Sequence, residues 1–318
     1  MRLARLILAI GALSFFSSAA ATSNPSERIS LRTIAERHGM TFREEREKSA
    51  TLTGSNCSIA CFLDKSSYVV NGVCVYGQGA AERSPRGLTI PLNDWKHILE
   101  PLISGRKVPG VHCICIDAGH GGKDSGAHSG ALNLTEKSLN LDVAKRLGNL
   151  LQSNGFKVLL TRDGDRFVPL EKRSSIANCG KADLFISIHF NASESPTAQG
   201  IEIYIMPRQG TAATARLSSP LRAKDAIFCP NNEFDDCNLL LAHGIGEKLM
   251  RLKGVRDRGV RRGRFCVLES VHCPAVLVEC GFITNQAEGA LIAQSAHRQA
   301  IASAICDGVI NYAAGATH

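Results

Sequence analysis

The most constraining stretch of the sequence is an apolar run, residues 111–116, that leads into a glycine-rich turn carrying a histidine. The run is long and apolar enough to form a buried β-strand. Gly119, Gly121 and Gly122 allow the chain to turn sharply after it. Because open α/β sheets bind their ligands at the carboxyl ends of the strands, we expect His120, inside this turn, to lie at a ligand-binding edge.

A glutamate follows the turn at the start of a predicted helix. Thr135 is a typical N-cap residue, and residues 136–151 have the apolar spacing of a helix. Glu136 is therefore expected in the first helical turn, close to the histidine loop. A glycine-rich turn before a helix can also bind phosphate. The pattern G-H-G-G-K-D-S-G matches neither the P-loop nor the dinucleotide-binding spacing, so nucleotide binding is disfavoured.

Strand-like runs alternate with helical patterns from residue 111 onward. Strands are predicted at 111–116, 157–161, 184–189, 200–206, 266–268 and 275–279. Helices are predicted at 136–151, 170–179, 239–252, 287–293 and 296–312. This alternation is typical of the α/β class, with a mainly parallel sheet and helices on both faces. We therefore assign residues 111–318 to one domain.

The N-terminus has the features of a secretory signal peptide. Arg2 and Arg5 precede an apolar core at residues 6–16, and small residues follow up to Ala21. We expect residues 1–21 to be cleaved off, with an uncleaved membrane anchor as the alternative. No later apolar run is long enough for a transmembrane helix, so we expect a soluble protein that is exported, either periplasmic or secreted.

Residues 22–104 are predicted to form a separate, small α+β domain. Helices are expected at 31–38 and 92–99, and strands at 50–53, 57–63, 67–70 and 73–76. Asn71 and Gly72 indicate a tight hairpin between the last two strands. In pattern only, this part resembles the stalk-like domain at the amino end of copper amine oxidases. This domain can either position the substrate or have a purely structural role, and the sequence favours neither. The basic link 104–110 is its expected boundary with the α/β domain.

The composition narrows the choice of partners. The net charge of +8 suits a polyanionic surface such as a cell wall, but ordinary solvated surface charge explains it equally well. Nucleic acid is disfavoured, because no recognition motif and no interleaving of basic and aromatic residues is present.

Twelve cysteines are many for an exported chain of 318 residues. Half of them lie inside apolar patterns and are interpreted as small buried side chains: Cys113, Cys115, Cys179, Cys266, Cys280 and Cys306. The better disulfide candidates are Cys57 with Cys61 or Cys74, and Cys229 with Cys237. No C-x-x-C pair occurs, so a thiolate zinc ribbon is disfavoured.

A second histidine ends the third predicted strand of the α/β domain. His189 follows the largely apolar run 184–188, and Asn191, two residues later, is a candidate substrate-binding residue. A lone histidine at a strand end is more often packed or exposed than functional. Two at equivalent strand ends can face one another with Glu136 between them. Two histidines and one glutamate form an established three-ligand zinc site with an open position for water.

The last predicted strand ends in a glutamate. Residues 275–278 are apolar, so a charged Glu279 is costly there unless it is paired or functional. Beside a water activated by zinc it would act as general base and then as general acid to the leaving amine. The alternative is a structural salt bridge to Arg258, Arg261 or Arg262.

Several blocks of sequence, taken in order, carry a family resemblance. They are IDAGHGGKDSGA, NLTEKSLNLDVAKRL, LLTRDGDRFVPLEKRSSIAN, ADLFISIHFNAS and DRGVRRGRFCVLESVHCPAVLVECGFITN, followed by the last helix. Residues 111–312 thereby resemble the zinc-dependent N-acetylmuramoyl-L-alanine amidases of bacterial cell-wall remodelling. The resemblance implies a six-stranded mixed sheet flanked by helices. It also implies zinc on His120, Glu136 and His189, and Glu279 as the catalytic carboxylate. The implied substrate is peptidoglycan, cleaved between the muramic acid lactyl group and L-alanine.

One long insertion, residues 207–238, interrupts the pattern and carries the acidic cluster Glu233, Asp235 and Asp236. Ordered loops of this length often act as lids or binding loops. Asp235 or Asp236 can equally be the start of the next helix. In some members of the resembled family a helix in this region blocks the zinc until an activator protein withdraws it. The prolines of this insertion and its lack of a helical period disfavour that regulation.

Two positions depart from the family pattern. Ala118 stands where proline is common, and Cys280 stands where threonine or serine is usual. Neither is expected to bind the metal, and Cys280 is expected to point to the opposite face of its strand from Glu279. Two other functions stay open: a catalytically silent wall-binding module, and a zinc carboxypeptidase that acts on peptide stems.

Overall fold

The computed structural model describes residues 27–45, 48–85, 87–105 and 108–315. The predicted signal peptide, residues 1–21, lies outside this part of the chain. None of the helices described is both long enough and apolar enough to cross a membrane.

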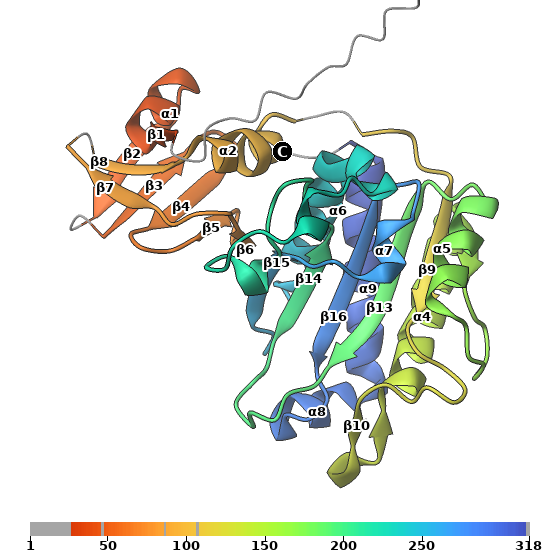
Figure 1. Cartoon of the computed structure of the whole chain (residues 1–318). Coiled ribbons are helices and arrows are strands. Elements are labelled where there is room, and N and C mark those ends of the chain that lie inside the picture. The colour runs from red at the N-terminus through yellow and green to blue at the C-terminus, as the bar shows by residue number, and fades with distance from the viewer. Residues whose placement is uncertain (1–26, 46–47, 86, 106–107, 316–318) are drawn as a thin grey trace, which may run out of the picture.

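Six strands form the sheet of the C-terminal unit, the number that the family resemblance implied. In spatial order they are β12 (Lys157–Leu160), β9 (Cys113–Ala118), β13 (Leu184–Asn191), β16 (Ala275–Phe282), β14 (Ile201–Ile205) and β15 (Asp257–Arg262). The first four are parallel, β14 is antiparallel to β16, and β15 is parallel to β14. The sheet is therefore mixed and mainly parallel, and β9, β13 and β16 end at the same edge (Figure 1).

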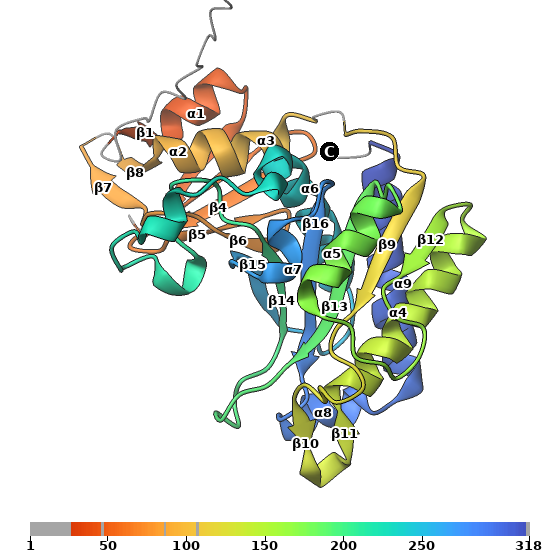
Figure 2. The same cartoon turned by 45° about the vertical axis from the view of Figure 1, so that its right-hand side comes forward.

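Helices cover both faces of this sheet. On one face lie α4 (Glu136–Ser153), α6 (Asp235–Leu249) and α9 (Ser295–Ala313); on the other lie α5 (Leu170–Cys179) and α7 (Cys266–Glu269). The helix α9 contacts both α4 and α6, and α8 (Gln286–Ile292) packs at the end of β16 (Figure 2). The predicted α/β class with helices on both faces is confirmed.

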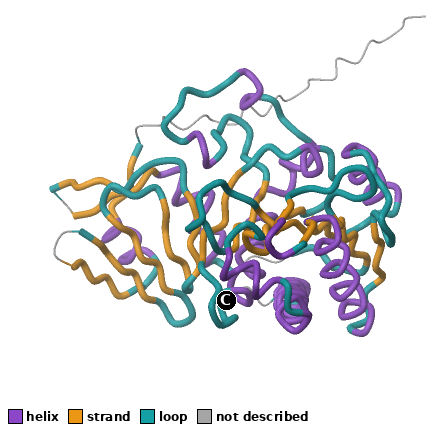
Figure 3. Tube along the Cα trace, turned by 90° about the horizontal axis from the view of Figure 1, so that it is seen from below, coloured by secondary structure: helices purple, strands orange, loops and turns teal. Residues whose placement is uncertain are grey.

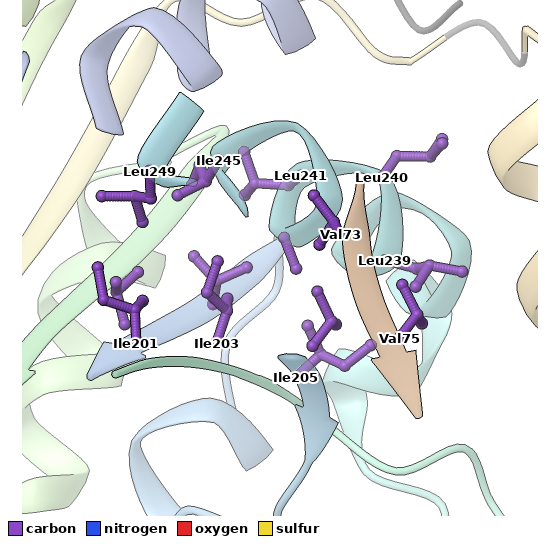
Figure 4. Packing of buried hydrophobic residues seen from close by; sticks show 14 of the residues in the cluster. Val73, Val75, Ile201, Ile203, Ile205, Leu239, Leu240, Leu241, Ile245 and Leu249 are labelled. Carbon is purple, nitrogen blue, oxygen red and sulfur yellow. The ribbon is translucent and has the colours of Figure 1, made fainter. Parts of the chain in front are cut away.

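Alternation along the strands separates an apolar face from a polar one. Ile201, Ile203 and Ile205 of β14 point toward α6 and pack against its leucines in the main core (Figure 4). The residues between them, Glu202 and Tyr204, therefore point to the opposite face of the sheet. That face carries the polar groups described below.

One predicted strand is wrong. Residues 266–268 belong to α7, where two adjacent side chains are buried, and the sixth strand is β15. The buried positions of β15 are taken by Gly259, Val260 and Arg262, so its sequence lacks the apolar alternation of a strand. Arg262 is buried because its guanidinium donates a hydrogen bond to the carbonyl oxygen of Tyr76.

The N-terminal unit continues the same sheet. Its strands follow β15 in the order β6 (Val73–Tyr76), β5 (Ser67–Val70), β4 (Ser58–Phe62), β3 (Ser49–Thr53) and β2 (Thr41–Glu45). Val75 of β6 pairs with Val260 of β15, so the strands form one band across the molecule (Figure 3). Asn71 and Gly72 have φ angles of 48° and 83°, as the predicted tight hairpin requires.

A small second sheet and short helices complete the N-terminal unit. The sheet contains β1 (Arg28–Ser30), β8 (Gly87–Pro91) and β7 (Glu82–Ser84), and the helices are α1 (Leu31–Arg37), α2 (Leu92–Asp94) and α3 (Glu100–Ile103). A π-helical segment, Trp95–Leu99, joins α2 to α3. The unit is α+β, as predicted.

No disulfide joins any of the twelve cysteines, all of which lie in the described part of the chain. The predicted disulfides are therefore wrong: Cys57 with Cys61 or Cys74, and Cys229 with Cys237. The last pair have different neighbours. Cys229 Sγ accepts a hydrogen bond from Arg264 Nη1 at 3.6 Å, whereas Cys237 lies beside Tyr312.

The insertion, residues 207–238, is anchored far from Glu279. It forms 3-10 turns at Thr214–Arg216, Ala223–Ala226 and Pro230–Phe234 before α6 begins at Asp235. Asn231 Nδ2 donates to the carbonyl oxygen of Cys273 at 2.9 Å, just before β16 starts. Glu279 lies six residues further on, about 20 Å along an extended strand. The anchor is therefore at the opposite end of β16 from the polar site.

Candidate metal centre

The three side chains predicted to bind zinc lie together at the carboxyl ends of β9 and β13. Oε1 of Glu136 lies 3.1 Å from Nε2 of His120 and 2.8 Å from Nδ1 of His189. One ligand atom from each residue lies within 4.8 Å of the other two. A tetrahedral zinc ion with bonds of about 2.1 Å needs donor atoms about 3.4 Å apart, so this donor set fits the ion in chemistry and spacing.

The chain reverses direction at His120. Its φ angle of 60° is in the left-handed region, which is uncommon for a residue other than glycine and is often found at functional sites. Gly119 is required by close approach, because a Cβ atom there would lie 2.3 Å from the ring of His189. The sharp glycine turn predicted from the sequence is therefore present, and it brings the two histidines together.

Two buried arginines hold the backbone of this turn. Arg162 donates to the carbonyl oxygens of Ala118 and Gly119, both at 2.8 Å. Arg173 donates to those of Ala118 and His120, also at 2.8 Å. Three successive carbonyls are thus fixed by side chains from outside the loop. Sequence reasoning missed both arginines, because the groups that they hold in this turn are backbone carbonyls, which leave no pattern in the sequence.

Asp117 balances the buried charge of Arg173. Its Oδ1 accepts hydrogen bonds from Arg173 Nη1 at 2.8 Å and Thr161 Oγ1 at 2.6 Å, and its Oδ2 accepts one from Ser187 Oγ at 2.8 Å. Both ionic side chains are at most 2% exposed. Because a buried ion pair is stable only when its hydrogen bonds are satisfied, this pair is a rigid base for the His120 turn.

Asp124 is a functional candidate that the sequence analysis missed. Its Oδ2 lies 2.8 Å from Nδ1 of His120, which leaves Nε2 of the same ring facing Glu136. A carboxylate that binds the far nitrogen of a histidine fixes the tautomer suited to metal binding. The sequence does contain a signal for this role, because Asp124 follows the candidate ligand His120 by four residues inside a tight turn.

The carboxylate of Glu136 is buried and held on both oxygens. Its Oε2 accepts the backbone N–H of Ala127 at 2.8 Å, and Asn140 Nδ2 approaches Oε1 at 3.3 Å. Burial raises the pKa of Glu136, but hydrogen bonds from His120 and His189 outweigh burial and hold the pKa well below its usual range. Glu136 is therefore ionised at neutral pH, as a carboxylate ligand must be.

Glu279 lies beside this cluster on the neighbouring strand. It is the register partner of His189, and its Oε2 is buried with no hydrogen-bond partner among the described residues. Burial raises the pKa of Glu279 to about 7; the positive charge of His189 opposes this shift, and the negative charge of Glu136 adds to it. An unpartnered carboxyl oxygen that titrates near neutral pH suits a group that accepts and returns a proton.

The alternative prediction for Glu279, a structural salt bridge to Arg258, Arg261 or Arg262, is wrong, because all three arginines bind other partners. Arg258 donates instead to Glu202 at 2.7 Å, and Arg261 lies 3.5 Å from the same carboxylate. Arg262 binds the backbone of the N-terminal unit. Asn191, the predicted substrate-binding residue, also donates to Glu202, at 3.0 Å.

The two departures from the family pattern stay clear of the metal cluster. Ala118 is fully buried in the core. Cys280 is 2% exposed and belongs to the main apolar core, on the opposite face of β16 from Glu279, as predicted.

Comparison with known proteins assigns the family. The sequence profile of the N-acetylmuramoyl-L-alanine amidases (Amidase_3) matches residues 114–311, and the chain belongs to this family. It is 36% identical to the amidase LytC of Bacillus subtilis over 199 residues, which are 63% of this chain and 35% of LytC. It is 34% identical to the amidase AmiA of Escherichia coli over 226 residues, covering 65% of this chain and 78% of AmiA. The match thus spans about a third of LytC and most of AmiA.

Solved amidase structures share the fold of the C-terminal unit. The amidase AmiC2 of Nostoc punctiforme superposes with a TM-score of 0.53 at 30% identity, covering 64% of this chain and 98% of AmiC2. The amidase CwlD of Clostridioides difficile, solved in complex with the GerS lipoprotein, gives 0.53 at 27% identity over 64% of this chain and 98% of CwlD. The family is generally zinc-dependent, and the His120, Glu136 and His189 cluster supplies a donor set of the matching kind.

Proposed function

We propose that this chain is an exported zinc hydrolase that cleaves the amide between N-acetylmuramic acid and L-alanine in peptidoglycan, in the remodelling or turnover of the cell wall. The observation that carries the proposal is the convergence of Glu136 on both His120 and His189, beside Glu279, whose Oε2 has no hydrogen-bond partner among the described residues. Family membership supports the choice of reaction.

In this proposal His120, Glu136 and His189 hold the metal. When bound, zinc would act as a Lewis acid on the scissile carbonyl and lower the pKa of a water molecule toward about 7. Asp124 would fix the ring of His120, and Asn140 would orient the carboxylate of Glu136.

Glu279 would move the proton. Its Oε2 takes a proton from the attacking water and returns it to the nitrogen of L-alanine as the amide C–N bond breaks. A pKa near 7 lets the same group serve as base and then as acid. Asn191 is kept as a substrate-binding candidate, because its carboxamide binds Glu202, and Glu202 lies next to Glu279.

The location and partners follow from the same proposal. Residues 1–21 would direct export to the periplasm or the outside of the cell, where peptidoglycan is the macromolecular partner. The proposal includes a protein activator among the partners, because the similar amidase CwlD was solved in complex with the GerS lipoprotein. Because the insertion 207–238 is anchored away from Glu279, we assign it neither the role of a lid over the site nor that of a segment that blocks the metal.

The experiment is digestion of purified sacculi by wild type and Glu279→Ala, with zinc measured in both proteins. We expect wild type to release free stem peptides that begin with L-alanine, and the variant to keep zinc and lose release. Release of terminal amino acids instead would identify a carboxypeptidase. Binding to sacculi without release would identify a wall-binding module.

A further inference from the structure

A second polar cluster lies beside Glu279 on the same face of the sheet. Glu202 of β14 is the register partner of Glu279, so the two side chains are adjacent. Glu202 is 3% exposed and uses both carboxylate oxygens: Oε1 accepts from Arg258 Nε at 2.7 Å, and Oε2 from Asn191 Nδ2 and Tyr204 Oη at 3.0 and 2.8 Å. These four polar side chains thus gather beside the proposed base.

One arginine of this cluster has hydrogen-bond donors that the protein leaves unused. Among the residues that the structure describes, Glu202 alone forms an ion pair with Arg258, and Arg261 lies 3.5 Å from the same oxygen. Arg258 uses only Nε in this pair, and its Nη1 and Nη2 donate to no protein atom in the described part of the chain. Its side chain is 34% exposed. A half-open guanidinium with two free N–H edges can bind a carboxylate in bidentate fashion.

Both arginines are held rigidly by aromatic rings. The guanidinium carbon of Arg258 lies 4.9 Å from the ring centre of Phe282, and that of Arg261 lies 4.6 Å from the ring centre of Tyr76. Arg261 Nη2 also donates to Tyr76 Oη at 3.1 Å. Tyr76 belongs to β6, so the N-terminal unit supports this cluster directly. Side chains that are ordered before binding lose less entropy when a ligand binds.

We infer that Arg258 and Arg261 form a subsite that binds a carboxylate on the peptide part of the substrate. This inference rests on the proposed function. In a muramoyl peptide whose lactyl group is in amide linkage, the sugar hydroxyl and acetamido groups are uncharged, so the anionic groups are on the peptide. The guanidinium of Arg258, on β15 two strands from Glu279, therefore selects the peptide side of the scissile bond and orients it.

The test uses two synthetic N-acetylmuramoyl peptides that begin with L-alanine and contain acidic residues, one with free carboxylates and one fully amidated. Wild type should cleave the acidic peptide with a kcat/KM about tenfold higher than the amidated one, as one bidentate contact would give. Arg258→Gln should raise KM for the acidic peptide about tenfold, with kcat within about twofold, and leave the amidated peptide within about twofold.

Two further variants separate recognition from structure. Arg258→Lys keeps the charge without the planar fork and should retain part of the preference. Arg146→Gln, which removes a similar arginine from an Asp142 ion pair on α4, should leave both substrates unchanged. An equal loss on both peptides in Arg258→Gln would assign Arg258 a structural role and overturn the inference. Cleavage of both peptides by wild type without preference would also overturn it, while the proposed function stands. Cleavage of neither peptide, with zinc bound, would overturn the proposed function and the inference together.

Discussion

The carboxylate of Asp124 lies 2.8 Å from Nδ1 of His120, on the opposite side of the imidazole from Glu136. This arrangement fixes both the orientation of the ring and the nitrogen left for a metal. Asp124→Ala should therefore weaken zinc binding about 10- to 100-fold, measured by competition with a chromogenic chelator. Asp163→Ala is the matched control, because Asp163 forms only an exposed pair with Arg166. Equal zinc affinity in both variants would show that the Asp124 contact does not support the metal.

Gly119 is the position where the fold and the metal cluster are most tightly coupled. A Cβ atom there would meet the His189 ring at 2.3 Å, so Gly119→Ala should displace the imidazole. Displacement of about 1 Å at a catalytic centre lowers turnover on the order of 10²-fold. We expect Gly119→Ala to lose most stem-peptide release and part of its zinc.

Gly164→Ala is the control for this prediction, because a Cβ atom at Gly164 meets nothing within 4 Å. Its activity and zinc content should match wild type. Full activity in Gly119→Ala would mean that the ring of His189 can shift without consequence, which would contradict its proposed role as a ligand.

The Asp117 and Arg173 pair should contribute to stability as well as to the His120 turn. Arg173→Met leaves the buried Asp117 without its cation and leaves the carbonyl of His120 without its donor. Removing one partner of a buried ion pair costs about 3 to 5 kcal/mol. Urea unfolding should show a loss of that size, whereas Arg166→Met, at an exposed arginine, should change stability by less than about 0.5 kcal/mol. A loss below about 1 kcal/mol in Arg173→Met would show that water or a local shift replaces the guanidinium.

The convergence of His120, Glu136, His189 and Glu279 was predictable because parallel strands end at a common edge, and each of these residues follows or begins a strongly patterned element. Their proposed roles remain predictions. The same reasoning could have identified Asp124, which follows His120 by four residues within the same turn.

Other features left no local pattern to detect. The buried arginines Arg162 and Arg173 bind backbone carbonyls, and β15 buries Arg262 by hydrogen bonding, so apolar periodicity indicates neither. The run 266–268 resembled a strand because short apolar runs fit either structure. The pairing of β6 with β15 joins residues far apart in sequence, so no local pattern could indicate that one sheet runs through both units.

The activity of the proposed hydrolase should depend on pH through Glu279. Burial raises the pKa of this carboxyl to about 7, and the base must be ionised to accept a proton from water. Release of stem peptides at saturating zinc should therefore be full above about pH 8 and fall about tenfold for each unit below pH 7. Zinc content measured at each pH separates this effect from loss of metal, since protonation of the ligands also weakens binding. Glu202→Gln removes a negative charge that raises the Glu279 pKa, so it should move the acid limb to lower pH. A rate that is constant between pH 5 and 8 with zinc fully bound would exclude Glu279 as the group that accepts the proton.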